Sequence, residues 1–417
     1  MSAIARKVAL GLLTRMKGGT IRVEENGREI GTFGTAGSDL HATLRIHDPR
    51  TWRALIGGSA GAGRAYMDGA WDSDDLVTLV RIGARDMPAF DRLRERLGPA
   101  LGPVQRTMWR ARSNTRARTR ERIASHYDLG NDFFSLWLDP TLSYSAALFP
   151  EPGATLAEAQ EAKVDRAFSR LELGPDDHLL EIGTGWGYLA ARAARVYGCR
   201  VTTTTVSQAQ HRFATELMRR EGLGDRVTVL LEDYRDLRGR YDKLISIEMI
   251  EAVGWEHLGL FMERCSDLLT RDGAMLMQAI VFPDDVYEVE KASIGFINEN
   301  IFPGGTIPSL EAIGREAGER TDLRLSALED LTPHYAETLR QWREAFAAAE
   351  ADLERLGYDE RFRRMWTMYL AYCEAGFLER RIRDVQALWA KPAFEGALDL
   401  PRISAWPQQH RALAVPA

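Results

Sequence analysis

The sequence predicts an α/β protein with two domains: a small mixed α/β domain, followed by a larger domain whose mostly parallel sheet is covered by helices. The chain has 417 residues, more than one compact core usually spans. An Asn26-Gly27 pair lies between two strand-like runs near the start. From about residue 175, apolar runs of strand length alternate with segments of helical length, which is typical of a parallel sheet with right-handed crossovers.

The small domain is predicted to begin with a β-hairpin. Runs 20–25 and 28–33 flank Asn26 and Gly27, the residue types that accept the positive φ angles of a type I′ turn. Apolar and polar residues then alternate over 40–46, which predicts a strand with one buried face.

Charge is distributed unevenly along the chain. Residues 1–125 carry 22 Lys/Arg against 13 Asp/Glu, a net +9, whereas the rest of the chain carries a net −15. This basic front half indicates an anionic partner, either a membrane surface or nucleic acid, unless the split is only uneven surface decoration. An arginine-rich segment over 109–125 is interpreted as a linker, either solvated or in contact with lipid phosphates.

The first 17 residues are basic, and Ile4, Val8 and Leu12 follow one side of a predicted helix. This pattern fits a helix that lies in a membrane interface, and it fits equally a helix that packs on its own domain. The apolar run is short and no small-residue cleavage site follows, so we do not expect a signal peptide.

Composition excludes several classes of protein. No run approaches the roughly 18 to 20 apolar residues that a membrane-spanning helix needs. Three cysteines stand far apart, which argues against a disulfide scaffold or a structural metal site and suits the cytoplasm. We therefore predict no metal.

The large domain has five predicted strands, each ending where a loop or helix begins. They lie at 178–182, 200–206, 226–231, 243–247 and 274–282. Residues 333–390 are predicted to form long amphipathic helices. Ligands bind to such sheets outside the carboxyl ends of the strands, so these ends are the expected site.

A glycine turn follows the first of these strands. Glu181 precedes Gly183-Thr184-Gly185-Trp186-Gly187, in a spacing that differs from those of dinucleotide-binding and P-loop motifs. Glycines let the backbone approach a ligand closely. This turn resembles the motif of class I S-adenosylmethionine (SAM) methyltransferases, which have a Rossmann-like, mostly parallel seven-stranded sheet.

Seven further motifs resemble the cyclopropane-fatty-acyl-phospholipid synthases, which are a family of these methyltransferases. They lie at 66–71, 124–134, 137–149, 205–210, 232–236, 248–254 and 301–305. The resemblance therefore runs over nearly the whole chain. It implies a small N-terminal domain over 1–108 for membrane or oligomer contact, and a methyltransferase domain over 126–417 whose helical lid over about 283–380 covers an acyl chain.

The resemblance also implies roles for individual residues. The implied SAM-binding residues are Tyr144, Ser145, Glu181, Gly183, Thr184, Gly185, Gly187, Thr205, Ser207, Gln210, Asp233 and Tyr234. The implied catalytic groups are Glu251, Tyr335, Gln278 and the backbone of Ile280. Candidates for the acyl pocket are Ala146, Trp366, Tyr369, Cys373 and Phe377, although helix packing explains any single aromatic residue, and burial explains Cys373, more readily than a role in the pocket does.

Two positions depart from the family pattern. Ala146 and Gln278 stand where the cyclopropane synthases have a cysteine and a histidine. Those groups, with a glutamate and a tyrosine, hold a bicarbonate ion that removes the final proton. It therefore stays open whether bicarbonate binds here or Glu251 itself is the base. The altered pattern resembles the branch of the family that makes 10-methylene chains on the route to tuberculostearic-type lipids.

The expected activity is SAM-dependent transfer of a carbon to the cis double bond of an oleoyl-type chain in a membrane phospholipid, most specifically giving a 10-methylene branch. Alternatives are a cyclopropane synthase with a substituted base site, an RNA methyltransferase and a non-catalytic lipid-binding module. We expect a homo-oligomer at the inner face of the membrane that binds anionic phospholipid and no nucleic acid, with a separate reductase as a further possible partner.

Overall fold

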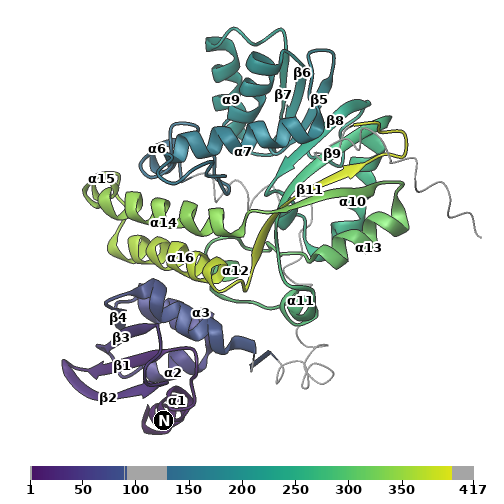
Figure 1. The fold of residues 1–417 in the computed structure, drawn as a ribbon. Helices are drawn as coiled ribbons and strands as arrows, with labels where there is room; N and C mark the ends of the chain where they lie inside the picture. The colour runs from purple at the N-terminus through teal and green to yellow at the C-terminus, as the bar shows by residue number, and fades with distance from the viewer. Residues whose placement is uncertain (1, 89, 92–128, 397–417) are drawn as a thin grey trace, which may run out of the picture.

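A computed structural model describes residues 2–88, 90–91 and 129–396, which form two units, each with its own sheet (Figure 1). The predicted linker over 109–125 lies outside these residues. The N-terminal unit has a four-stranded sheet in the order β2-β1-β3-β4, and the second unit has a seven-stranded sheet in the order β10-β11-β9-β8-β5-β6-β7. In each unit, helices pack on the sheet (Figure 1).

The N-terminal unit begins with a helix and the predicted hairpin. Its elements are α1 (Ser2–Leu13), β1 (Thr20–Glu25), β2 (Arg28–Gly34), β3 (His41–Ile46), α2 (Thr51–Ile56), α3 (Gly58–Met67) and β4 (Trp71–Ser73), followed by a helical segment over 76–88. Asn26 and Gly27 have φ angles of 51° and 75°, so the predicted turn is confirmed. The alternation over 40–46 is also confirmed, because Leu44 and Ile46 are buried in β3.

The seven-stranded sheet has a parallel centre and an antiparallel edge. Its strands are β5 (His178–Ile182), β6 (Arg200–Thr204), β7 (Val227–Leu230), β8 (Tyr241–Ile247), β9 (Leu269–Val281), β10 (Arg324–Asp330) and β11 (Arg383–Ala390). Strands β5 to β9 pair in parallel, whereas β11 runs antiparallel to β9 and β10. The predicted α/β fold with a mostly parallel seven-stranded sheet is confirmed.

The prediction of helix up to residue 390 was wrong in its last part. Residues 383–390 form β11, whose side chains are buried between β9 and β10. A short apolar run that is buried on both faces has no periodicity to distinguish a strand from a helix. Strand β10 was not predicted, and its partly exposed side chains give it only a weak apolar pattern.

Helices cover both faces of this sheet. Neighbouring residues of β8 point to opposite layers: Leu244 packs in the cluster that contains α10 and α13, and Ile245 packs in the cluster that contains α7 and α8. The helices are α6 (Asn131–Ser135), α7 (Leu156–Leu171), α8 (Tyr188–Arg192), α9 (Gln208–Arg220), α10 (Leu258–Leu268), α11 (Asp284–Glu290), α12 (Phe296–Asn300), α13 (Leu310–Arg320), α14 (Thr332–Ala348), α15 (Glu350–Arg355) and α16 (Glu360–Leu378); a π-helical turn (Ala193–Tyr197) and 3₁₀ turns (Ile250–Ala252 and Trp255–His257) complete them.

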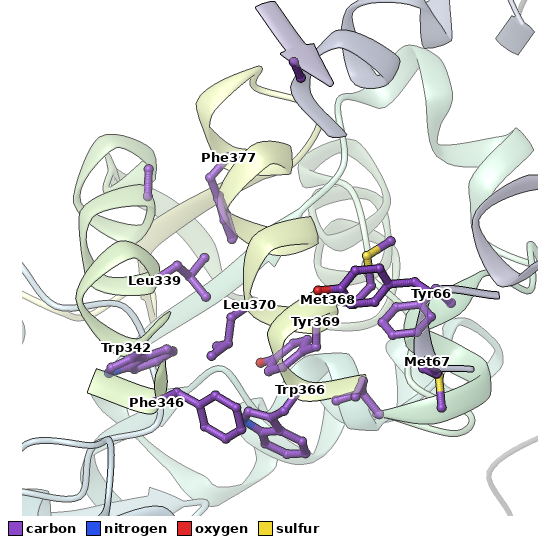
Figure 2. Close-up of a cluster of buried hydrophobic side chains, with 14 of the residues drawn as sticks. Tyr66, Met67, Leu339, Trp342, Phe346, Trp366, Met368, Tyr369, Leu370 and Phe377 are labelled. Carbon is purple, nitrogen blue, oxygen red and sulfur yellow. The ribbon is translucent and has the colours of Figure 1, made fainter. Parts of the chain in front are cut away.

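Helix α16 joins the two units, because it packs on α3 of the N-terminal unit and on α14 of the second unit (Figure 1). Figure 2 shows the aromatic side chains of α14 and α16 facing each other, with Tyr66 and Met67 of α3 beside α16. Arg364 of α16 stacks on the Tyr66 ring, with its guanidinium carbon 4.1 Å from the ring centroid, and donates a 2.6 Å hydrogen bond to the Tyr66 carbonyl. In the same interface, α3 approaches α12 so closely that a Cβ at Gly63 would lie 2.2 Å from the Phe296 ring. The N-terminal unit is therefore held against the helices that cover the strand ends.

Across the part of the chain that the structure describes, no helix is long and apolar enough to cross a membrane.

Candidate active site

The glycine turn after β5 forms one wall of a large cavity. Gly183, Gly185 and Gly187 have φ angles of 106°, 53° and 91°, which side chains rarely allow. A Cβ at Gly185 would meet no atom within 4 Å, so the turn leaves open space in front of its backbone. Gly183 and Gly185 line the cavity, whereas Gly187 caps the start of α8 and packs against Ala214.

A buried polar network supports this turn from below. The hydroxyl of Thr203 donates a 2.5 Å hydrogen bond to the Glu181 carboxyl group, and the hydroxyl of Thr184 lies 2.7 Å from that of Thr203. Burial raises the pKa of Glu181 to about 8, and the Thr203 hydrogen bond only partly opposes this shift. Glu181 therefore holds the loop as a largely neutral, hydrogen-bonded group at pH 7.

The cavity has a volume of about 1210 Å³ and extends from the glycine turn to the N-terminal unit. Single-ligand pockets usually have roughly 300–1,000 Å³, so this space can hold two ligands together. Its polar end includes Thr205, Gln210 and Asp233 at the carboxyl ends of β6 and β7. Its apolar end reaches Leu12 of α1 and Ile56 of α2.

Aromatic side chains form the wall between the two ends. The hydroxyls of Tyr144 and Tyr369 are 2.7 Å apart, and the ring of Phe302 lies edge-on to Tyr369 with centroids 6.0 Å apart. Tyr335 stacks on Phe377 with centroids 4.3 Å apart. All five residues line the cavity. A cation that forms beside these rings is stabilised by their π faces, by about 0.5–2 kcal/mol for each ring.

Glu248 lies directly after β8 and accepts three hydrogen bonds. Its Oε1 accepts from the Ala146 backbone N–H and from the Gln278 side-chain amide, both at 2.8 Å, and its Oε2 accepts from the Tyr335 hydroxyl at 2.7 Å. Gln386 donates to the Gln278 carbonyl oxygen at 3.0 Å, which turns the Gln278 amide nitrogen toward Glu248. Burial raises the pKa of Glu248, and these three donors oppose that shift because they favour the ionised form.

Glu251 lies one turn further along and has a different environment. Its Oε1 accepts a 2.6 Å hydrogen bond from the Ile280 backbone N–H, while its Oε2 has no hydrogen-bond partner among the described residues. Burial, and secondly the charge of Glu248, raise the pKa of Glu251 to about 8. Glu251 is therefore mostly protonated at pH 7, and its single donor supports an ionised form less than the three donors of Glu248 do.

A third carboxyl group and a lysine complete this cluster, which we call the carboxyl cluster (Glu248, Glu251, Asp384 and Lys163). Asp384 accepts a 3.1 Å hydrogen bond from Gln278, and its pKa is well above the usual range because of burial and the charges of Glu248 and Glu251. Lys163 is buried in α7 and donates a 2.7 Å hydrogen bond to the Ser145 hydroxyl. Burial lowers the pKa of Lys163 to about 8, against the opposing charges of the cluster.

The structure brings most of the predicted site residues to one cavity. Those that line it are Tyr144, Ser145, Glu181, Gly183, Thr184, Gly185, Thr205, Gln210, Asp233, Tyr234, Glu251, Ile280, Tyr335, Tyr369, Cys373 and Phe377. Ser207 caps the start of α9 instead, Trp366 packs on Phe133, and the Asp233 carboxylate pairs with Arg235 at 2.6 Å. Burial raises the pKa of Cys373 to about 12, which keeps it a neutral thiol.

One predicted grouping differs. Tyr335 and Gln278, which were expected beside Glu251, donate to Glu248 instead. Sequence reasoning assigned no role to Glu248, Lys163 or Asp384. A signal for Lys163 was present, because it occupies a position on the apolar face of α7 beside Val164 and Ala167. Asp384 has no comparable signal, since its neighbours in the site come from distant parts of the chain.

Comparison with known proteins decides the family. A family model described as mycolic acid cyclopropane synthetase matches residues 114–387. The chain belongs to this family. It is 40% identical to the tuberculostearic acid methyltransferase UfaA1 of Mycobacterium tuberculosis over 357 residues, which are 83% of each chain. It is 34% identical to the cyclopropane-fatty-acyl-phospholipid synthase of Escherichia coli over 354 residues, 84% of this chain and 86% of that one.

Solved structures agree with this membership. The cyclopropane synthase MmaA2 of Mycobacterium tuberculosis has a TM-score of 0.61 and 31% identity, over 65% of this chain and 98% of that chain. The mycolic acid cyclopropane synthase CmaA1, complexed with SAH and CTAB, has the same TM-score at 32% identity and the same coverage. The protein is a SAM-dependent C-methyltransferase that transfers a methyl or methylene carbon to the double bond of a lipid acyl chain.

Proposed function

We propose that this enzyme converts the cis double bond of an oleoyl-type chain in a membrane phospholipid to a 10-methylene branch. The observation that supports this proposal best is the cavity. A glycine turn, an aromatic wall and two carboxyl groups with different numbers of hydrogen-bond donors all line it. The similarity to a tuberculostearic acid methyltransferase supports the methylene product over a cyclopropane. Ala146 and Gln278, which depart from the cyclopropane-synthase pattern, support it further because both contact Glu248.

The residues of the polar end fit SAM. The open face of the glycine turn, the hydroxyl of Thr205 and the amide of Gln210 would hold it, with Tyr144 and Ser145 at the border of the apolar end. Bound SAM supplies an electrophilic methyl group. An isolated alkene is a weak nucleophile, so the protein must hold the double bond close and in line, and such positioning contributes about 7–11 kcal/mol in well-oriented systems.

The aromatic wall would protect the cation that the acyl chain becomes when it gains the methyl group. The rings of Tyr144, Tyr335 and Phe302 exclude water that would otherwise add to this cation, and their faces stabilise positive charge. Two outcomes then compete. Loss of a proton from the added methyl, with its C–H electrons closing onto the neighbouring carbon, gives cyclopropane. A hydride shift between the two former alkene carbons, followed by the same proton loss, gives an exocyclic methylene.

The substrate chain would enter from a membrane at the N-terminal unit. Ile4, Val8 and Leu12 form a line along α1 and are 72%, 46% and 38% exposed. This line ends at the apolar end of the cavity, which Leu12 itself lines. Lys7 and Arg15 are exposed on the same helix and its continuation, which favours an anionic bilayer as the partner.

The test is product identification with purified protein, SAM and vesicles of dioleoyl phosphatidylglycerol or dioleoyl phosphatidylcholine. We expect oleoyl chains to gain 14 mass units (about one CH₂), with the branch located at carbon 10 by fragmentation, and faster turnover on the anionic vesicles. Cyclopropane as the sole product would reject the methylene assignment. Equal turnover and binding on both vesicles would reject the anionic membrane surface.

A further inference from the structure

Glu248 occupies the place where an anion is expected to bind. The resemblance to the cyclopropane synthases assigns a bicarbonate ion to the groups that Ala146, Gln278 and Tyr335 represent here. In this structure the donors of all three residues are directed at the Glu248 carboxylate, at 2.7 to 2.8 Å. The residues present therefore do not fit a bicarbonate ion in that position, because a protein carboxylate already takes their hydrogen bonds.

We propose that Glu248 is the built-in anion of this active site and accepts the proton that the substrate loses, so that turnover needs no bicarbonate. The proposal rests on the proposed function and names the group that completes it. Glu248 lines the same cavity as the glycine turn and the aromatic wall, and Tyr335 of that wall donates to it. Its carboxylate therefore borders the space that SAM and the acyl chain would share.

The proton step balances with this group alone. After the hydride shift, a C–H bond of the added methyl breaks, its electron pair becomes the π bond between that carbon and the adjacent cationic carbon, and the proton bonds to a Glu248 oxygen. A proton next to a carbocation is very acidic, so the acceptor needs to be ionised and close rather than strongly basic. Glu248 meets this need better than Glu251, since it has three donors whereas Glu251 has one.

The charged groups around Glu248 come from several elements. Glu251 and Asp384 add carboxyl groups, Lys163 of α7 adds a cation, and Tyr335 adds a hydroxyl whose pKa is well above its usual range because of burial and the charge of Glu248. Burial raises the pKa of all three carboxyl groups. Since they cannot all be ionised so close together, the one with the most hydrogen-bond donors carries the charge. The hydrogen bonds identify that group as Glu248.

The backbone conformation of Glu248 also distinguishes it from the other residues of the carboxyl cluster. Its φ angle is 46°, in the left-handed region, which strains a residue that carries a side chain. Such strain persists only where the surrounding structure holds it, as the three hydrogen bonds do here. Glycine accepts this conformation without strain, so Glu248→Gly should preserve the backbone and leave a carboxylate-sized space between three donors.

The experiment measures turnover of oleoyl vesicles by the full chain in CO₂-free buffer and with added bicarbonate. We expect the wild type to work equally well in both. Glu248→Gly should lose about 10²- to 10⁴-fold in turnover, the usual contribution of a positioned base, and recover at least tenfold with bicarbonate or formate. Glu248→Gln should lose as much and show no recovery, because its amide fills the space.

Glu172→Gly is the matched control, since Glu172 also has a left-handed φ of 50° but is exposed at the end of α7. It should keep full turnover. SAM binding measured by calorimetry shows which variants are folded; if Glu248→Gly does not bind SAM, the Glu248→Gln variant and the wild-type response to bicarbonate decide alone. A wild type that stops without bicarbonate, or full activity in both Glu248 variants, overturns the inference. A wild type that makes no methylated lipid under any condition overturns the proposed function instead.

Discussion

The two ends of the reaction site are built in different ways. The SAM end consists of a glycine turn and of residues that follow β5, β6 and β7 closely in the sequence. The proton-accepting end consists of one carboxylate, Glu248, whose three donors come from residues 146, 278 and 335. A local motif therefore specifies the first end, whereas only the complete fold assembles the second.

Apart from substitutions of Glu248 itself, we expect the largest loss of turnover when Tyr335 is replaced. Tyr335→Phe removes one of the three donors, and a hydrogen bond to a charged group contributes about 1.5–3 kcal/mol. Turnover should fall about tenfold to a hundredfold because Glu248 is no longer fixed beside the substrate. The dissociation constant for SAM should stay within about twofold of the wild-type value. Turnover assays and calorimetry measure the two quantities separately.

Tyr358→Phe is the control for this change. Its hydroxyl donates a 2.5 Å hydrogen bond to the Leu129 carbonyl, within the aromatic cluster beside α6 and away from the cavity. It should lower stability a little without lowering turnover. Equal losses of turnover in the two variants would mean that Tyr335 acts only through stability. The role of Tyr335 in the proton-accepting end would then be contradicted.

The difference between the ends explains what could be predicted from the sequence. The Asn26-Gly27 hairpin, the five central strands and the glycine turn depend on short-range patterns, and each was found at its place. Strand β11 and its residues Asp384 and Gln386 join the site through pairing with β9. Such long-range pairing leaves no periodic trace in the sequence. The family resemblance alone placed Tyr335 and Gln278 beside Glu251, whereas the structure directs both donors at Glu248.

The second prediction concerns the SAM end. Gly183→Ala places a side chain at a φ angle of 106°, which costs about 1–3 kcal/mol, although its Cβ would meet only Met249 at an ordinary 3.5 Å. The turn must then shift away from its ligand-binding shape. SAM affinity should therefore fall about tenfold, while turnover at saturating SAM changes less than about threefold.

Gly224→Ala is the matched control, because Gly224 lies in a loop with open space around its Cβ position and no positive φ. It should change neither SAM affinity nor turnover. If Gly183→Ala lowered turnover at saturating SAM as strongly as Tyr335→Phe does, the two ends would not be separable in function.

The smallest expected effect is a change in the pH dependence of the free energy of unfolding when Glu251 is replaced. Glu251 has a pKa of about 8 in the folded protein, raised from its ordinary value of 4.5 by burial. The folded state therefore binds more protons than the unfolded state between these values, and stability falls as pH rises through that window. Glu251→Gln removes this contribution, so the loss of stability from pH 5.5 to 7.5 should become shallower, by at most about 1.4 kcal/mol per pH unit.

Urea unfolding at several pH values measures this slope, and Glu256→Gln, which removes an exposed carboxyl group nearby, is the control. The pKa values of Glu181, Glu248 and Asp384 are also raised, so these groups will leave part of the slope in place. Lys163 titrates near pH 8, above the chosen window. An unchanged slope in Glu251→Gln would mean that Glu251 is already ionised in the folded enzyme. Two adjacent charged carboxylates would then face the substrate, and the assignment of the proton acceptor to Glu248 would lose the asymmetry on which it depends.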